Sequence, residues 1–244
     1  MKKVFFTLGL LTFLSAGLMA QIAYEQFEST PMQPKADKID LFKKGIAAHN
    51  KKYHAADPYK GSVWTDLTGP TSGDYVWYMG PTTWAQMDNR PGAGEHQLDW
   101  DKNVTPYVES YGEVTYWRMN KDVNYMPEGG SAAAFTKSRG RFNYIKPGQM
   151  DRYIEQMKKV VAVYKSLKST ASFYLATRQG ASAGPHAVTY SDFASWSWLD
   201  STPDFAKQFD VVHGQGAYAK FIAELDLCTD RTKTYDVLSE LVKE

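Results

Sequence analysis

This chain of 244 residues contains a single cysteine, Cys228, and therefore cannot form a disulfide within itself. Small secreted domains are often held together by several disulfides, and that class of protein is excluded here. The fold must instead be stabilised by a hydrophobic core. A chain of this length can bury a sizeable core, either as two small domains or as one fused unit.

The chain also lacks a strong charge of either sign. Its formal net charge is +1, and residues 1–20 carry two lysines and no acidic residue, so the charge without them is −1. A nearly neutral chain has no electrostatic footprint for nucleic acid or for an anionic membrane surface. We therefore expect neither as a partner, apart from the membrane that the N-terminus would cross during export.

Long apolar runs are missing except at the N-terminus. Two lysines precede a nearly continuous apolar run over Val4–Leu14, and the segment ends at the small residue Ala20. This order is typical of a secretory signal peptide cleaved before Gln21. The run is shorter than the roughly 20 residues that span a bilayer, although an uncleaved anchor is the alternative. We expect an exported protein, periplasmic or extracellular.

An internal repeat is the strongest feature that the chain does contain. Within residues 76–91, five residues recur at a constant offset of 112, as Val188, Tyr190, Trp196, Asp200 and Pro203. A second window, at an offset of 111, relates residues 39–53 to residues 150–164. Such periodicity predicts a duplicated unit. Coincidence between two aromatic-rich segments is the alternative.

Both halves show the same order of predicted elements. In the first half, hydrophobic periodicity and turn residues predict strands at 26–30, 62–67, 74–79 and 114–119. They predict a helix at 39–53 and short helical segments within 81–108. In the second half, the corresponding strands fall at 141–145, 172–177, 186–190 and 234–238. The corresponding helix falls at 150–168, and helical segments follow within 193–227. Each half is therefore predicted as β-α-β-β-α-β, the split unit of ferredoxin-like folds.

A ferredoxin-like unit covers one face of its sheet with helices, and two units can hide their bare faces by pairing them into a closed or nearly closed barrel. In its element order and duplication the chain resembles the dimeric α/β-barrel superfamily, which includes the NIPSNAP, EthD-like and antibiotic-biosynthesis monooxygenase families, in a single-chain form. The resemblance implies an α+β fold. With the signal peptide at 1–20 and a linker of small residues at 129–136, the ferredoxin-like repeats fall at 21–128 and 137–244. The resemblance also implies an internal pseudo-dimer, and we expect a monomer.

The strand predicted at 74–79 suggests where a ligand would bind. Val76 and Tyr78 have identical counterparts in the second half, whereas Tyr75 and Trp77 do not. Alternate residues of a strand point to opposite faces. We predict that the shared face packs against helices and that the diverged face lines the barrel interior.

Five residues are the candidate ligand-binding set on this interpretation. Trp64, Tyr75 and Trp77 would stack on a small aromatic or cyclic ligand, and Arg118 and Arg141 would bind an anionic group. A cavity of aromatic residues with a few convergent polar groups is the usual form of a small-molecule site. Ordinary filling of the barrel by these side chains is the alternative.

The histidines form no HExxH or comparably close ligand pattern, so we predict no metal site. His49 lies on the packing stripe of the first helix and is expected in the core. His54 with Asp57 is only a weak ligand pair. His96 and His213 are weak catalytic candidates, because the resemblance places their segments near a cavity mouth, where an imidazole can transfer protons or ligate haem. A surface position is the alternative for both.

Three functions follow from these observations. The first is an exported protein that binds a small aromatic or cyclic ligand inside an α/β barrel. The second, implied by the resemblance, is a barrel-type enzyme: a cofactor-free or haem-dependent oxygenase, or an isomerase. The third is a structural module of the cell envelope with a filled barrel. Fold alone does not decide among them.

Overall fold

The computed structural model describes residues 25–201 and 204–243. The predicted signal peptide lies outside the described residues. No helix within these ranges has both the length and the apolar character needed to cross a membrane.

The elements follow the predicted order, with one additional strand, β4, that the sequence did not predict. The first half contains β1 (Gln26–Pro34), α1 (Ile39–Tyr53), β2 (Gly61–Asp66), β3 (Tyr75–Thr82), α2 (Trp84–Met87), α3 (Glu95–Asn103), β4 (Val108–Tyr111) and β5 (Thr115–Tyr125). The second half contains β6 (Lys137–Asn143), α4 (Met150–Ser166), β7 (Phe173–Arg178), β8 (Ala187–Phe193), α5 (Ser197–Ser201), α6 (Phe205–His213), α7 (Ala217–Cys228) and β9 (Tyr235–Leu241). Short 3₁₀ turns lie at Thr105–Tyr107 and Ala132–Ala134.

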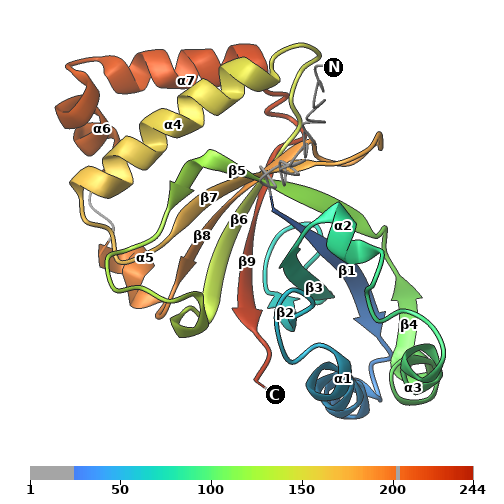
Figure 1. Ribbon diagram of the computed structural model, residues 1–244. Helices are drawn as coiled ribbons and strands as arrows, with labels where there is room; N and C mark the ends of the chain where they lie inside the picture. The colour runs from blue at the N-terminus through green and yellow to red at the C-terminus, as the bar shows by residue number, and fades with distance from the viewer. Residues whose placement is uncertain (1–24, 202–203, 244) are drawn as a thin grey trace, which may run out of the picture.

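Eight strands of the described chain form a closed antiparallel barrel. Their order is β1-β3-β2-β9-β6-β8-β7-β5, and β5 pairs back with β1, while β4 extends the edge of β1. Within each half the order is the same, β5-β1-β3-β2 and β9-β6-β8-β7, and the halves join through β2–β9 and β5–β7. Helices α4, α6 and α7 lie outside the barrel beside the second half, and α1 and α3 lie beside the first (Figure 1). The α+β class and the closed barrel are therefore confirmed.

Aromatic rings fill the barrel interior, and they come from the face that the two halves share. The hydroxyl oxygens of Tyr78 and Tyr190 lie 3.2 Å apart, and the ring of Phe27 packs against both, with centroids 5.9 and 6.4 Å away. Tyr190 belongs with Val188 and Trp117 to one buried cluster. The prediction that the shared face packs against helices was wrong. Residues that meet inside the barrel must fit each other, which keeps them alike, whereas each helix layer packs separately and is free to diverge.

Tyr75 and Trp77 lie on the opposite, helix-covered face of the sheet. The ring of Tyr75 packs edge-on against Phe42 of α1, with centroids 5.3 Å apart. The indole Nε1 of Trp77 donates to Asn50 Oδ1 of α1 at 2.9 Å. Both residues belong to the core between the sheet and α1. Their predicted place inside the barrel is therefore corrected.

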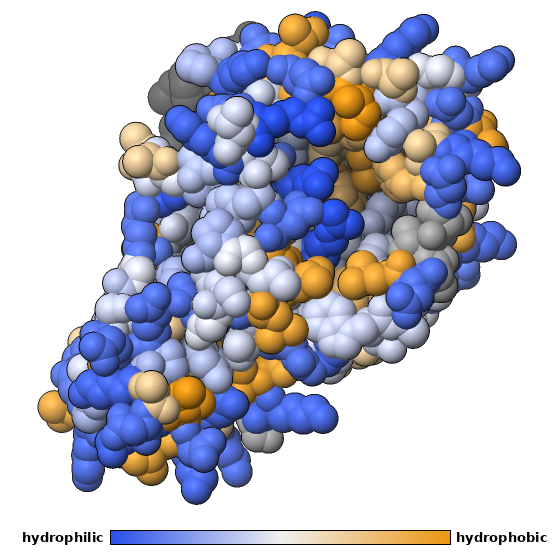
Figure 2. Space-filling model, turned by 180° about the vertical axis from the view of Figure 1, so that it is seen from behind, coloured by the Kyte–Doolittle hydropathy of each residue, from blue (hydrophilic) through white to orange (hydrophobic). Residues whose placement is uncertain are grey.

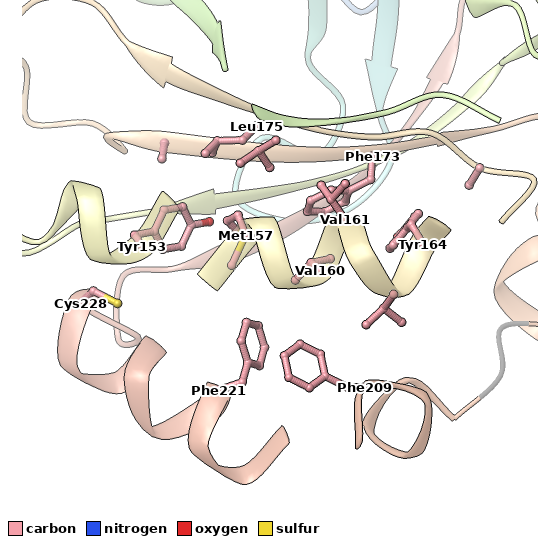
Figure 3. Packing of buried hydrophobic residues seen from close by; sticks show 14 of the residues in the cluster. Tyr153, Met157, Val160, Val161, Tyr164, Phe173, Leu175, Phe209, Phe221 and Cys228 are labelled. Carbon is pink, nitrogen blue, oxygen red and sulfur yellow. The ribbon is translucent and has the colours of Figure 1, made fainter. Parts of the chain in front are cut away.

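A larger core lies between the sheet of the second half and its helices. Helix α4 turns one apolar stripe toward the sheet and toward α6 and α7, as its 3.6-residue periodicity requires. Phe209 of α6 and Phe221 of α7 meet beneath α4, with ring centroids 4.7 Å apart (Figure 3). Burial of such side chains contributes roughly 1.5–3 kcal/mol each. This packing fixes the distance between the helices and the sheet.

Candidate functional site

Three histidines converge under the helices of the first half. His49 belongs to α1, His54 follows its last residue, and His96 belongs to α3. The Nε2 atom of His96 lies 3.1 Å from Nε2 of His49 and 3.0 Å from Nε2 of His54. One ligand atom from each of the three lies within 4.8 Å of the other two. We call this group the histidine cluster.

Hydrogen bonds fix the tautomer of two of these histidines. His49 Nδ1 lies 2.8 Å from Asp99 Oδ2, and His54 Nδ1 lies 2.8 Å from the backbone oxygen of Tyr59. An ionised carboxylate and a carbonyl accept but do not donate, so both Nδ1 atoms carry the proton. The Nε2 atoms of neutral His49 and His54 therefore present lone pairs toward His96.

Burial keeps the imidazoles of the cluster neutral. It lowers the pKa of His54 to about 4, and it also lowers the pKa of His49 and of His96. The hydrogen bond from His49 lowers the pKa of Asp99, which is consistent with an ionised carboxylate at that position. The cluster therefore offers uncharged nitrogen donors beside one anionic hydrogen-bond acceptor.

Aromatic rings wall the cluster. The ring of His49 packs against Trp100, His54 against Trp77 and His96 against Tyr53, with centroids 4.9, 5.0 and 5.0 Å apart. A shallow groove of about 480 Å³ runs beside His54, lined by Ala47, Ala48, Asn50, Lys51, His54, Ala55, Lys60 and Gly61. The cluster is thus shielded by rings and lies next to a concave surface.

Local sequence explains how α1 and α3 bring these side chains together. His49 continues the buried stripe of α1 that contains Phe42 and Ile46. At the crossing with α3, a Cβ on Gly45 would lie 1.8 Å from the backbone oxygen of Asn103. Only glycine permits so close an approach at this position, so Gly45 sets the distance between the two helices that carry His49 and His96.

A separate cavity of about 360 Å³ lies between the sheet of the second half and α4, α6 and α7. Its polar residues come mainly from β6 and β8, namely Arg139, Arg141, Asn143, Thr189 and Ser191. Its apolar residues come mainly from the helices and include Met157, Phe205, Tyr218, Phe221, Ile222 and Leu225. In the space-filling view this side of the molecule is hollowed, with hydrophobic and strongly hydrophilic residues meeting at the hollow (Figure 2). We call it the helix–sheet cavity.

One acidic residue organises the arginines at the helix–sheet cavity. Asp236 of β9 accepts from Arg139 Nη2 at 2.6 Å and from Arg141 Nε and Nη2 at 2.6 and 3.0 Å. Burial alone would raise the pKa of Asp236, but the hydrogen bonds from the two arginines outweigh it and lower the pKa. The arginine side chains remain 44% and 50% exposed, which leaves donors free to reach a ligand.

The structure does not gather the predicted ligand-binding residues around one cavity. Tyr75 and Trp77 are in the core of the first half, and Arg141 lines the helix–sheet cavity of the second. Trp64 is half-buried on β2, where its indole donates to Ser62. Arg118 lies on β5, opposite Gln26 in the β1–β5 pairing.

The histidines also differ from what their spacing indicates. His49 is fully buried, as expected. His54 is buried and binds the backbone of Tyr59, while Asp57 is exposed, so these two residues are not a ligand pair. His96 belongs to the histidine cluster. His213 Nε2 lies 3.0 Å from the backbone oxygen of Lys159, which ties α6 to α4. No pattern of close spacing could find the cluster, since His96 is 47 and 42 residues from its neighbours.

No family model matches the chain, and no curated protein matches it in sequence. Solved structures do match over most of its length. An anthrone oxidase-like protein superposes with a TM-score of 0.55 at 12% identity, over 90% of this chain and 92% of that one. A proposed monooxygenase from Lactobacillus acidophilus NCFM gives 0.55 at 12% identity, over 90% and 93%. A chlorite dismutase from Candidatus Nitrospira defluvii gives 0.52 at 8% identity, over 91% and 92%.

The chain has the dimeric α/β-barrel fold. At these identities the likeness establishes the fold and nothing about chemistry. The closed barrel with helices outside is what the present chain shares with all three proteins. Function must be argued from its own side chains.

Proposed function

We propose that this chain binds a small anionic molecule with an aromatic or cyclic body in the helix–sheet cavity. The observation that carries the proposal is the composition of that cavity: arginine and hydroxyl groups on the sheet face apolar and aromatic residues on the helices. Apolar walls with a few placed polar groups are the usual form of a small-molecule site, and about 360 Å³ lies within the usual size range.

The arginines supply recognition of an anionic group. Arg141 donates two hydrogen bonds to Asp236, from Nε and from Nη2. This bidentate pairing fixes the orientation of its guanidinium group. A ligand carboxylate or phenolate would take up the remaining donors of Arg139 and Arg141. The hydrogen bonds to Asp236 hold both side chains in place before a ligand arrives, so little rotamer entropy is lost on binding.

The helices supply the apolar side of the site. Tyr218 and Phe221 of α7 lie with ring centroids 6.0 Å apart, and Phe205 of α6 lies 6.3 Å from Tyr218. A flat ring system buried among such residues gains from both burial and ring contacts. The proposed ligand is therefore a carboxylate or phenolate on one or two fused rings.

Export and duplication belong to the same proposal. The order of charged, apolar and small residues over 1–20 supports an exported protein. The repeated sequence window and the identical strand order within each half support two tandem ferredoxin-like units. Such a chain closes its own barrel and would be a monomer in the periplasm or outside the cell.

Binding of 1-naphthoate to the chain beginning at Gln21, measured by calorimetry, tests this function. We expect binding that weakens at least tenfold in Arg141→Gln and is unchanged in Arg152→Gln. Arg152 is the matched control, because it pairs with Glu224 of α7 and is not among the residues that line the cavity. The neutral analogue 1-naphthylmethanol should bind the wild type and Arg141→Gln alike. No binding of naphthoate, or equal binding by all three proteins, would overturn the proposal.

A barrel-type enzyme is the second candidate, and the names of the structural neighbours favour it: two are described as oxidase-like or as a monooxygenase. The helix–sheet cavity would then hold a substrate. A haem-dependent form fits poorly, because no histidine is among the described residues that line the cavity and His213 is engaged with the backbone of Lys159. We therefore favour cofactor-free chemistry for that cavity. Turnover of a hydroquinone by the purified chain, lost in Arg141→Gln, is the distinguishing assay.

A further inference from the structure

We infer that His49, His54 and His96 form a binding site for a single divalent transition-metal ion, of which Zn²⁺ is the first candidate. The site lies in the first half and shares no residue with the helix–sheet cavity. The inference about the metal ion is therefore independent of the ligand proposed for that cavity.

The spacing of the nitrogen atoms suits such an ion. Zinc binds imidazole nitrogen at 2.0–2.1 Å, which places the nitrogens of a tetrahedral site about 3.3 Å apart. The Nε2 atoms of His49 and His54 lie 3.1 and 3.0 Å from Nε2 of His96. The ligand atoms of the third pair, His49 and His54, lie within 4.8 Å of each other, so the side chains would adjust their positions as the ion binds.

Hydrogen bonding alone does not satisfy these nitrogens. Both His49 and His54 present an Nε2 lone pair, because their Nδ1 protons are used by Asp99 and Tyr59. If His96 carries its proton on Nε2, that one proton must serve both lone pairs, and the buried Nδ1 of His96 has no hydrogen-bond partner among the described residues. If the proton is on Nδ1, three lone pairs face one another. Either arrangement leaves nitrogen lone pairs without a hydrogen-bond donor of their own, and a bound cation would accept them.

The surroundings have the features that orient metal-binding histidines. The carboxylate of Asp99 accepts from His49 and is itself held by Asn103 Nδ2 at 3.0 Å. A carboxylate or carbonyl behind each ligating imidazole fixes its tautomer and raises its basicity. Tyr59 plays the same part for His54 through its backbone oxygen. Two of the three histidines are therefore prepared for coordination through Nε2.

The donor set indicates the class of ion and what it could do. Neutral imidazoles suit zinc, copper, iron and nickel, whereas calcium and magnesium prefer oxygen ligands. Three protein nitrogens leave a coordination position for water or for an oxygen atom of a substrate, the arrangement of catalytic rather than structural zinc sites. His96 is partly exposed, so the cluster lies close to the surface of the protein.

Metal analysis of the chain beginning at Gln21 tests the inference. After removal of metals with a chelator, titration with Zn²⁺ by calorimetry should give one ion per chain. Co²⁺ should give the strong visible bands of a tetrahedral ion. Saturating Zn²⁺ should also raise the midpoint of thermal unfolding, since an ion that binds only the folded state stabilises it.

Variants separate this site from adventitious binding. His96→Ala should lower zinc affinity at least 100-fold, and Asp99→Asn should lower it by about 10- to 100-fold through loss of the supporting carboxylate. His213→Gln, in the second half, is the control and should bind as the wild type does. If His96→Ala does not fold, His96→Gln, of similar size, gives the same comparison. Zinc binding that is absent from the wild type, or equal in the His96 variant and the control, would overturn the inference.

Discussion

The hydroxyl groups of Tyr78 and Tyr190 lie 3.2 Å apart inside the barrel, although 112 residues separate them in the chain. Tyr78 comes from β3 and Tyr190 from β8, which hold the same place in the strand order of their halves. The same offset relates the repeated residues of the sequence. Residues that match along the chain thus meet in space. Burial raises the pKa of both tyrosines well above its ordinary value, so both stay protonated at neutral pH.

This pair predicts a measurable coupling. Tyr78→Phe removes one hydroxyl and leaves the other without its partner, which is expected to cost about 1–3 kcal/mol of unfolding free energy. Adding Tyr190→Phe removes the stranded group, so the double variant should be nearly as stable as either single one. Urea unfolding of the four proteins measures the coupling, which should about equal the cost of one single substitution, about 1–3 kcal/mol. Additive effects would show that the two hydroxyls do not interact.

Sequence patterns predicted the elements well because these depend on local information, whereas the closed barrel was predicted from the internal repeat and the resemblance to a known superfamily. Apolar spacing marks α1 and α4, and glycine-rich turns separate β2 from β3 and β7 from β8. Which strand face turns inward is not a local property. Tyr75 and Tyr78 are both aromatic, and only their partners in space, Phe42 for one and Tyr190 for the other, distinguish the two faces.

The helix-facing position of Trp77 changes what its substitution should do. Trp77→Ala is expected to lower the unfolding free energy by about 3–5 kcal/mol, as for other large core truncations, rather than to remove a ligand contact. Trp77→Phe keeps most of the ring volume and loses the hydrogen bond to Asn50, which should cost about 1 kcal/mol. Trp84→Ala is the comparison, since Trp84 is 41% exposed. A stable Trp77→Ala protein would contradict the packing described here.

The histidine cluster could not be predicted from spacing for a different physical reason. His49 and His54 are close in the chain, but the third member comes from α3, and the helix crossing depends on Gly45 and on the burial of α1. The positions of histidines along a sequence do not indicate which of them lie together where two helices cross. The one usable signal is Gly45 itself. Glycine in the interior of a helix ordinarily lowers stability, and it is expected there where two backbones approach closely.

Asp192 makes stability depend on pH. Burial raises the pKa of its carboxyl to about 6, from an ordinary value of 3.8. Between these values the folded chain holds a proton that the unfolded chain releases, so stability falls as pH rises through about 4 to 6. The full loss is about 3 kcal/mol at most. Asn at this position cannot ionise. The unfolding free energy of Asp192→Asn minus that of wild type should therefore rise over this window and then stay level, whereas a difference independent of pH would exclude a raised pKa.

Replacement of Gly45 by alanine is expected to change the unfolding free energy in the direction opposite to the usual one. In the interior of a helix, alanine is normally more stable than glycine by about 1 kcal/mol. Here a Cβ would lie 1.8 Å from the backbone oxygen of Asn103, so Gly45→Ala must push α3 away from α1 and is expected to destabilise the fold. Lys44→Ala, at an exposed position one residue earlier, should change stability by less than about 0.5 kcal/mol. Because α1 carries His49 and α3 carries His96, the same displacement should weaken zinc binding, and urea unfolding with and without Zn²⁺ measures both effects. A Gly45→Ala protein more stable than wild type would mean that the two helices do not cross at this distance.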